Sequence, residues 1–145
     1  MTEPDPIEVM VQIAAQPRTV FPYFTDPARY VEWMGSNATI EPVPGGAYRV
    51  GIRGGVEAVG QFVEVDPPRR LVFTWGWSHE HAVAPGSTRV VVTLEEKDGG
   101  TLVVLRHYGL PGDEQRQQHR AGWEMYLGRL VVRGAGGDPG PDPNH

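Results

Sequence analysis

The chain has 145 residues, with 39% hydrophobic and 21% charged residues, a net charge of −5 and no cysteine. This composition fits one globular domain, and the negative charge without a basic stripe argues against binding of nucleic acid or of an anionic membrane surface. The lack of cysteine excludes disulfides, thiolate catalysis and cysteine-ligated metal sites. We find no signal peptide and no apolar stretch of membrane-spanning length, and therefore expect a cytoplasmic protein without membrane insertion.

The first elements are a strand and two short helices. Alternating apolar residues over 7–14 predict a strand with one buried face. A proline at position 17 then favours a short helix over 19–24. Asp26 and Pro27 are suited to cap and open a second helix, which we expect from Ala28 to about Met34, before Gly35.

From residue 36 to 108 the pattern is that of β-structure. Apolar and polar residues alternate in short runs that are separated by turns rich in glycine and proline. The expected strands cover 38–43, 47–52, 56–65, 69–77, 86–95 and 101–108. Because the turns are short, consecutive strands should pair antiparallel, as a meander.

The run over 69–77 carries the largest side chains. Leu71, Phe73, Trp75 and Trp77 alternate, so they share one face of the strand. Four such side chains on one face need another element to cover them.

A long C-terminal helix can supply this cover. Asp113 is a fair N-cap, and the helix should run to about Arg133 before three glycines. About 20 residues at 1.5 Å each would cross a whole sheet. One helix face is formed by His119, Trp123, Tyr126, Leu127 and Leu130. We expect one domain over 1–137 and an extended or mobile tail over 138–145.

Several motifs, in this order and spacing, resemble one known family. They are Val20-Phe21-Pro22-Tyr23-Phe24-Thr25-Asp26-Pro27, Trp33-Met34-Gly35, Pro44-Gly45-Gly46-Ala47-Tyr48, the run from Gly60 to Trp75, Gly100-Thr101, His107-Tyr108-Gly109-Leu110-Pro111 and His119-x-x-Gly122-Trp123. The chain thus resembles the AHSA1-like family (activator of Hsp90 ATPase homologue 1-like) of the SRPBCC, START or Bet v 1-like superfamily. The resemblance implies an α+β helix-grip fold, in which a curved antiparallel sheet of six to seven strands surrounds the long helix and leaves a cavity.

Such a cavity, lined by aromatic residues, favours binding of a hydrophobic small molecule such as a lipid, a polyketide or an aromatic metabolite. The candidate ligand-binding residues are Tyr48, Phe73, Trp75, Trp77, Leu105, His107, His119, Trp123, Tyr126 and Leu127. The alternative interpretation is that these rings simply fill the core. We expect Trp75 to face Trp123 near His107, and Trp77 to lie at the pocket mouth.

His107 shares a strand face with Val103 and Leu105, so it should point inward. It can be a ligand contact or a general acid and base, or it can be a structural histidine with satisfied hydrogen bonds. His119 could join it, but no third ligand is in place for a metal, and we expect no metal or other cofactor. His79 and His81 fall in a polar loop, where we expect them to be solvated.

Two other functions remain open at this stage. The first is an enzyme of the cyclase or hydrolase type that uses the same cavity, with His107 as acid and base. The second is an interaction module for a chaperone. No nucleophile elbow, phosphate-binding loop or dinucleotide fingerprint supports another enzyme class. An exposed sheet edge would also allow a homodimer.

Overall fold

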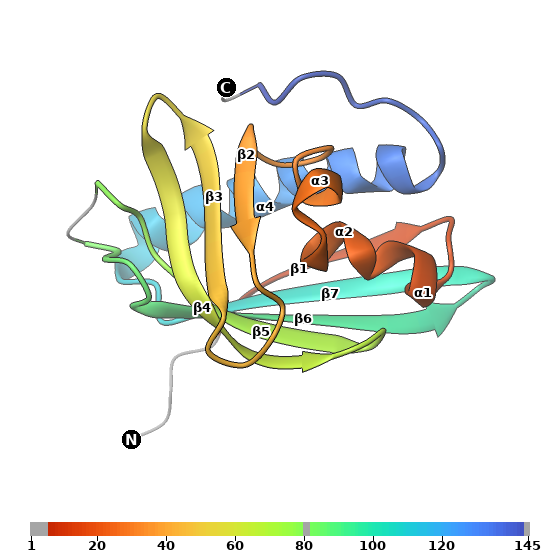
Figure 1. Cartoon of the computed structure of the whole chain (residues 1–145), viewed down its shortest axis with the longest axis horizontal. Coiled ribbons are helices and arrows are strands. Elements are labelled where there is room, and N and C mark those ends of the chain that lie inside the picture. The colour runs from red at the N-terminus through yellow and green to blue at the C-terminus, as the bar shows by residue number, and fades with distance from the viewer. Residues whose placement is uncertain (1–5, 80–81, 144–145) are drawn as a thin grey trace.

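The computed structural model describes residues 6–79 and 82–143, and shows one curved antiparallel sheet with a long helix against it (Figure 1). The elements are β1 (Ile7–Ile13), α1 (Pro17–Val20), α2 (Pro22–Thr25), α3 (Pro27–Tyr30), β2 (Asn37–Ile40), β3 (Ala47–Arg53), β4 (Val56–Asp66), β5 (Arg70–Trp75), β6 (Thr88–Lys97), β7 (Gly100–Tyr108) and α4 (Gly112–Gly134). The predicted α+β helix-grip architecture is confirmed.

The sheet order is β1-β7-β6-β5-β4-β3-β2, so strands β2 to β7 form the predicted meander and β1 pairs with β7. In Figure 1 strands β2, β3 and β4 stand steeply against the strands on the other side of the sheet. The register between β4 and β5 shifts between Phe62 and Glu64. Because an irregularity of this kind bends a strand, it helps the sheet to curve around α4.

Three short helices follow β1, where the sequence predicted two. The predicted helix over 19–24 is divided, because Phe21 ends α1 and Pro22 opens α2. Proline has no N–H to donate and therefore starts helices more readily than it continues them. Asp26 caps α3 as expected, since its carboxylate accepts a hydrogen bond from the N–H of Ala28 at 3.0 Å.

The segment after α3 turns sharply at Gly35. Helix α3 ends at Tyr30, earlier than predicted, and helical turns continue to Met34. Gly35 has φ +78°, and a Cβ there would lie 2.7 Å from the carbonyl oxygen of Gly51. Only glycine fits this turn against β3.

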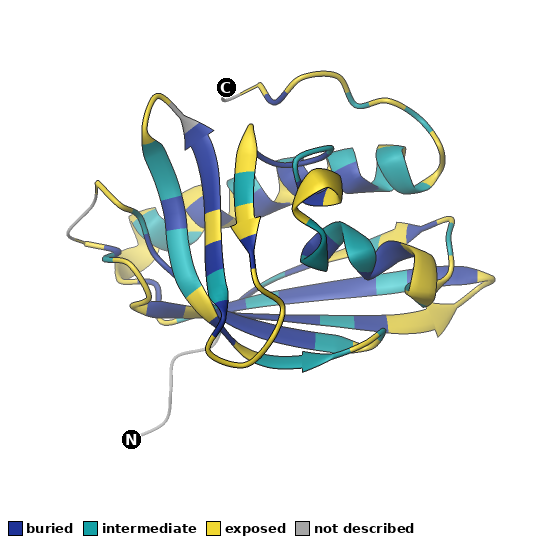
Figure 2. Cartoon of the chain, viewed as in Figure 1, coloured by how far each residue is buried: buried dark blue, intermediate teal, exposed yellow. Residues whose placement is uncertain are grey.

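Helix α4 crosses the concave side of the sheet (Figure 1). Its five buried residues are the predicted face, namely His119, Trp123, Tyr126, Leu127 and Leu130. Buried positions run through β5, β6 and β7 and form a stripe on α4 (Figure 2). The helix begins at Gly112 with Pro111 as N-cap, so Asp113 lies in the first turn and is not the predicted cap.

The described part of the tail, 138–143, forms neither helix nor strand, and it returns along the fold. The guanidinium of Arg129 donates hydrogen bonds to the carbonyl oxygens of Pro139, Gly140 and Pro141. Asp142 is buried, and its carboxylate accepts from the N–H of Gly35 at 2.7 Å. The tail is therefore packed on the domain, while the division at residue 137 stays a prediction.

Within 6–79 and 82–143 we find no helix that combines the length and the apolar character required to cross a membrane.

Candidate ligand-binding site

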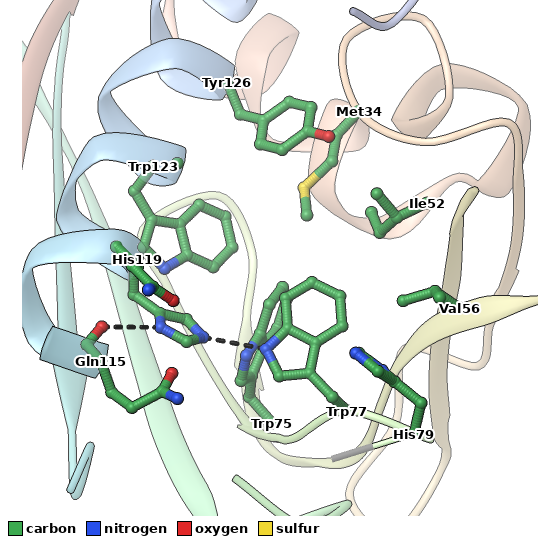
Figure 3. Close-up of a pocket in the computed structure, with 12 residues that line it drawn as sticks. Met34, Ile52, Val56, Trp75, Trp77, His79, Gln115, His119, Trp123 and Tyr126 are labelled. Carbon is green, nitrogen blue, oxygen red and sulfur yellow. Dashed lines mark hydrogen bonds between the residues drawn. The ribbon is translucent and has the colours of Figure 1, made fainter. Parts of the chain in front are cut away.

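A pocket of about 290 Å³ lies between the sheet and α4 (Figure 3). Its walls come from β3, β4, the end of β5, the loop after β5, α4 and the turn before β2. The lining residues are Met34, Ile52, Val56, Trp75, Trp77, His79, Gln115, Gln118, His119, Gly122, Trp123 and Tyr126. Three tryptophans form the largest part of the aromatic wall, and Tyr126 also belongs to it.

The three tryptophans come from two regions that are distant in sequence, namely the end of β5 with the loop after it, and α4. Trp75 ends β5 on its inward face, as the alternation over 69–77 predicted, and Trp123 projects from α4. The ring centroids of Trp75 and Trp123 lie 5.0 Å apart, and those of Trp75 and Trp77 lie 5.2 Å apart in an edge-to-face arrangement. These contacts confirm the expected facing of Trp75 and Trp123.

Trp77 lies beyond the last residue of β5 and is held by its backbone. Its N–H donates to the carbonyl oxygen of Val83 at 2.7 Å, and it forms an isolated bridge with Ala58. Gly76 makes this possible, since a Cβ at residue 76 would collide with the carbonyl group of Ala84. The chain therefore leaves the sheet with Trp77 still on the pocket side.

His107 is fully buried and takes part in a continuous chain of hydrogen bonds. Trp123 Nε1–H donates to His107 Nδ1 at 3.1 Å. His107 Nε2 then carries the ring proton and donates to Thr88 Oγ1 at 2.8 Å, and the Thr88 hydroxyl donates to the carbonyl oxygen of Trp75 at 2.8 Å. These hydrogen bonds give both ring nitrogens of a neutral His107 imidazole a partner.

Burial lowers the pKa of His107 well below its usual value of 6.5, and the neighbouring His119 lowers it further. The charged form is disfavoured because the interior solvates it poorly. His107 does point inward, as predicted, but it is absent from the residues that line the pocket. Its hydrogen bonds are those expected of a structural histidine.

His119 lies on the pocket wall and links α4 to the loop after β5. Its Nε2 accepts a hydrogen bond from Trp77 Nε1–H at 3.0 Å. Its Nδ1 is 2.8 Å from the carbonyl oxygen of Gln115, one helical turn earlier, so the ring proton is on Nδ1 (Figure 3). His119 thus fixes the ring of Trp77 at the mouth of the pocket.

The tail is hydrogen-bonded to two parts of the chain that form the pocket wall. Tyr126 lines the pocket, and its hydroxyl donates to the carboxylate of Asp142 at 3.1 Å. The same carboxylate binds the N–H of Gly35, the residue after Met34 of the pocket wall. One buried side chain therefore ties together α4, the tail and the turn before β2.

The family model of the activator of Hsp90 ATPase homologue 1-like protein matches residues 14–133 of this sequence. The chain belongs to the AHSA1-like family. This assignment also gives it the SRPBCC or Bet v 1-like superfamily, as the motif order predicted.

Similar solved structures agree with this family assignment. An AHSA1-like protein from Rhizobium etli is 46% identical, with a TM-score of 0.76 over 96% of this chain and 87% of its own. DynU16, from the dynemicin biosynthetic locus, is 28% identical with a TM-score of 0.80. The match covers 95% of this chain but 50% of DynU16, so this chain spans about half of that protein.

A dimeric protein is also among the structural neighbours. The Aha1 dimer from Colwellia psychrerythraea is 14% identical, with a TM-score of 0.76 over 93% of this chain and 97% of its own, and shows the fold alone. A search of curated proteins gave no match.

Five of the ten predicted binding residues of this AHSA1-like chain line the pocket, and five lie outside its lining. Trp75, Trp77, His119, Trp123 and Tyr126 are on the wall. The five outside the lining, all nearly inaccessible to solvent, are Tyr48, Phe73, Leu105, His107 and Leu127. Tyr48 illustrates the reason, since its ring stacks on Phe73 with centroids 4.1 Å apart and its hydroxyl lies 2.5 Å from that of Tyr30. These side chains pack the core beneath the pocket.

Seven lining residues were not singled out as binding residues by the sequence. Gln115 and Gly122 precede and follow His119 by four and three positions, so helical periodicity could have placed them on its face. Gln118 lies beside them, while Met34, Ile52, Val56 and His79 come from the curved part of the sheet and its loops. His79 is exposed at the rim, as expected, and His81, for which the same was expected, lies outside the described residues.

We find no group of three histidine, aspartate or glutamate side chains able to hold a metal ion in the part of the chain that the structure describes.

Proposed function

We propose that this AHSA1-like domain binds a small neutral aromatic molecule in the pocket between the sheet and α4. One observation carries the proposal, namely the 290 Å³ pocket with Trp75, Trp77 and Trp123 in its wall. Ligand sites are typically concave, mostly apolar and equipped with a few polar groups. Here His79, Gln115, Gln118 and His119 supply the polar groups.

Size and charge support an aromatic metabolite over the other ligands that we considered. The volume is at the lower end of the roughly 300–1,000 Å³ of small-molecule sites. It suits a molecule of a few rings better than a long-chain lipid. The twelve lining residues include no lysine or arginine, which favours a neutral ligand over an anion. The likeness to DynU16, whose gene lies in a biosynthetic locus, is consistent with a metabolite.

Binding without turnover is the function that we favour for this pocket. The alternative needs His107 as acid and base, but both of its nitrogens bond to Thr88 and Trp123, and the ring does not line the pocket. A general acid or base must come within hydrogen-bond reach of the proton that it transfers.

A pair of glycine substitutions on α4 tests the proposal. Gly122 lines the pocket, Gly128 does not, and a Cβ at either position meets no atom within 4 Å. Leucine is a far better helix former than glycine, and both substitutions gain the same helix propensity, so the two variants differ in whether the new side chain enters the pocket. We expect Gly122→Leu to weaken binding of tetralin, an uncharged two-ring hydrocarbon, at least tenfold, while Gly128→Leu binds as the original chain does.

The readout is the quenching of tryptophan fluorescence during titration with tetralin. Native mass spectrometry of the protein as purified should in addition identify any molecule that remains bound. Equal affinities of the two leucine variants would contradict the proposal, and so would a complete lack of tetralin binding to the original chain.

Two further expectations are kept as proposals. We propose that the protein forms a homodimer. Light scattering after gel filtration tests this, and a monomer mass at micromolar concentration would contradict it. We also propose a cytoplasmic location, to be tested by cell fractionation.

A further inference from the structure

Trp75 differs from the other three tryptophans in one respect. The indole N–H groups of Trp33, Trp77 and Trp123 donate to the carbonyl oxygen of Tyr23, to His119 Nε2 and to His107 Nδ1, at 2.9, 3.0 and 3.1 Å. The indole nitrogen of Trp75 is the one buried side-chain nitrogen or oxygen without a hydrogen-bond partner in residues 6–79 and 82–143. Trp75 is 2% exposed.

No side chain of residues 6–79 and 82–143 accepts a hydrogen bond from Trp75. The rings around it belong to Tyr48, Trp77, Trp123, His107 and His119. The nitrogens of His107 bond to Thr88 and Trp123, and those of His119 bond to Gln115 and Trp77. Since buried donors are rarely left unpaired, the missing acceptor should come from outside the chain.

We propose that Trp75 determines the specificity of the pocket by donating its indole N–H to a neutral oxygen acceptor of the ligand. The inference rests on the proposed function and narrows the ligand class to aromatic molecules with a ketone, quinone or ether oxygen. A neutral acceptor is favoured because the lining contains no lysine or arginine.

The N–H of Trp75 is buried, so a ligand can reach it only if a neighbouring side chain moves, and we infer that this side chain is Trp77. In Figure 3 the ring of Trp77 lies in front of Trp75, and the nitrogen edges of both rings face His119. Trp77 is partly exposed, lies beyond β5 and has one side-chain hydrogen bond, to His119. A ligand ring can therefore take its place against Trp75 without breaking the pairing of β5.

Two probes of nearly equal shape test the inference. 1-Tetralone and tetralin have the same two-ring skeleton, and only the first has a carbonyl oxygen. In protein labelled with ¹⁵N in tryptophan, we expect 1-tetralone to move the signal of the Trp75 indole proton downfield. Tetralin, which has no oxygen acceptor, should not cause this downfield shift. The Trp33 signal is an internal control, because Trp33 does not line the pocket. This measurement needs no substitution.

A second measurement uses Trp75→Phe, which removes the N–H but keeps an aromatic ring. The ratio of the Kd values of tetralin and 1-tetralone should fall about two- to tenfold relative to the original chain, as for the loss of one hydrogen bond. The ratio cancels differences in the hydration of the two probes. Trp33→Phe is the matched control, since it removes a buried indole away from the pocket and should leave the ratio unchanged.

The possible outcomes separate this inference from the proposed function. The inference alone would be overturned if both probes bind, the Trp75 indole signal is the same with 1-tetralone as with tetralin, and Trp75→Phe leaves the Kd ratio unchanged. The inference alone would also be overturned if the acceptor of the Trp75 N–H is a bound water molecule that 1-tetralone does not displace. A lack of binding by both probes would overturn the proposed function and the inference with it.

Discussion

The indole nitrogen of Trp123 lies 3.1 Å from Nδ1 of His107, so the long helix and the last strand are joined by a hydrogen bond to an unprotonated imidazole nitrogen. Protonation of His107 would place a second donor against the indole N–H and break this bond. The main consequence of the contact is therefore electrostatic, since the folded state keeps the histidine neutral.

Stability should consequently fall as the pH is lowered through the usual histidine range. The folded-state pKa of His107 lies well below 6.5, so below about pH 6.5 the unfolded chain binds a proton that the folded chain does not. The contribution is complete above pH 6.5 and is lost as the pH falls, with a slope of up to about 1.4 kcal/mol per pH unit. Urea unfolding between pH 7.5 and 5.5 measures it.

The control for this pH dependence is a second histidine. His107→Gln retains a donor and an acceptor but cannot titrate, so its stability should vary less over this range. His79→Gln changes an exposed histidine outside this group of hydrogen bonds and is the matched control. Among the described residues, the titratable group that acts on the pKa of His107 is His119, with ring centroids 5.4 Å apart. Equal slopes for both variants would show that His107 is not the group responsible.

Thr88→Val should destabilise the fold although the two side chains have nearly the same shape. Thr88 Oγ1 accepts from His107 Nε2 and donates to the carbonyl oxygen of Trp75. Valine removes both hydrogen bonds and leaves the buried Nε2–H of His107 without its acceptor, at a cost of about 1–3 kcal/mol. Thr88→Ser keeps the hydroxyl and should lose less. Denaturant unfolding at pH 7.5 gives both values, and the prediction fails if valine is tolerated as well as serine.

The residues of this site fall into those placed by the regular period of a strand or helix and those placed by the curvature of the sheet. Only the first kind could be predicted from the sequence. Trp75 and Trp123 were predicted because a strand alternates with period two and a helix face repeats every three to four residues. Ile52 and Val56 were missed because their approach to Trp77 depends on the curvature of the sheet. The register shifts between Gly51 and Arg53 and between Phe62 and Glu64 contribute to that curvature, and neither has a period in the sequence.

The tail illustrates the same limit. Its glycines and prolines correctly predicted the absence of helix and strand in its described part, but composition contains no information on contacts. The attachment depends on individual long-range contacts, chiefly from Arg129 to three carbonyl oxygens and from Asp142 to Gly35 and Tyr126.

Asp142→Ala should therefore act on both stability and the pocket. It removes the acceptor of the Gly35 N–H and of the Tyr126 hydroxyl, and we expect a loss of about 1–3 kcal/mol. Tyr126 lines the pocket, so tetralin affinity should change as well. Asp138→Ala alters an exposed carboxylate of the same tail and serves as the control. Thermal unfolding measures the stability of both variants, and fluorescence titration measures their tetralin affinity. Equal stability and equal affinity of the two variants would contradict the assigned role of Asp142.

Gly76→Ala should disturb the mouth of the pocket. The added methyl group would collide with the carbonyl group of Ala84, so the loop after β5 must move, and Trp77 with it. We expect a destabilisation of about 1–3 kcal/mol, which is typical of overpacking. The Trp77 indole signal should also shift in the ¹⁵N spectrum. Gly128→Ala, with open space around its Cβ, should be neutral or stabilising. An unshifted Trp77 signal in Gly76→Ala would refute the link.

The pairing of β1 with β7 has a consequence for synthesis of the chain on the ribosome. Ile7 pairs with His107, and every other contact of this ladder also joins the two ends of the domain. At about 5–20 residues per second, β1 waits several seconds for its partner to be translated. Such non-local contacts slow folding, typically to milliseconds or seconds. The fold therefore closes late, and its first strand is exposed to aggregation or to a chaperone until the last strand emerges.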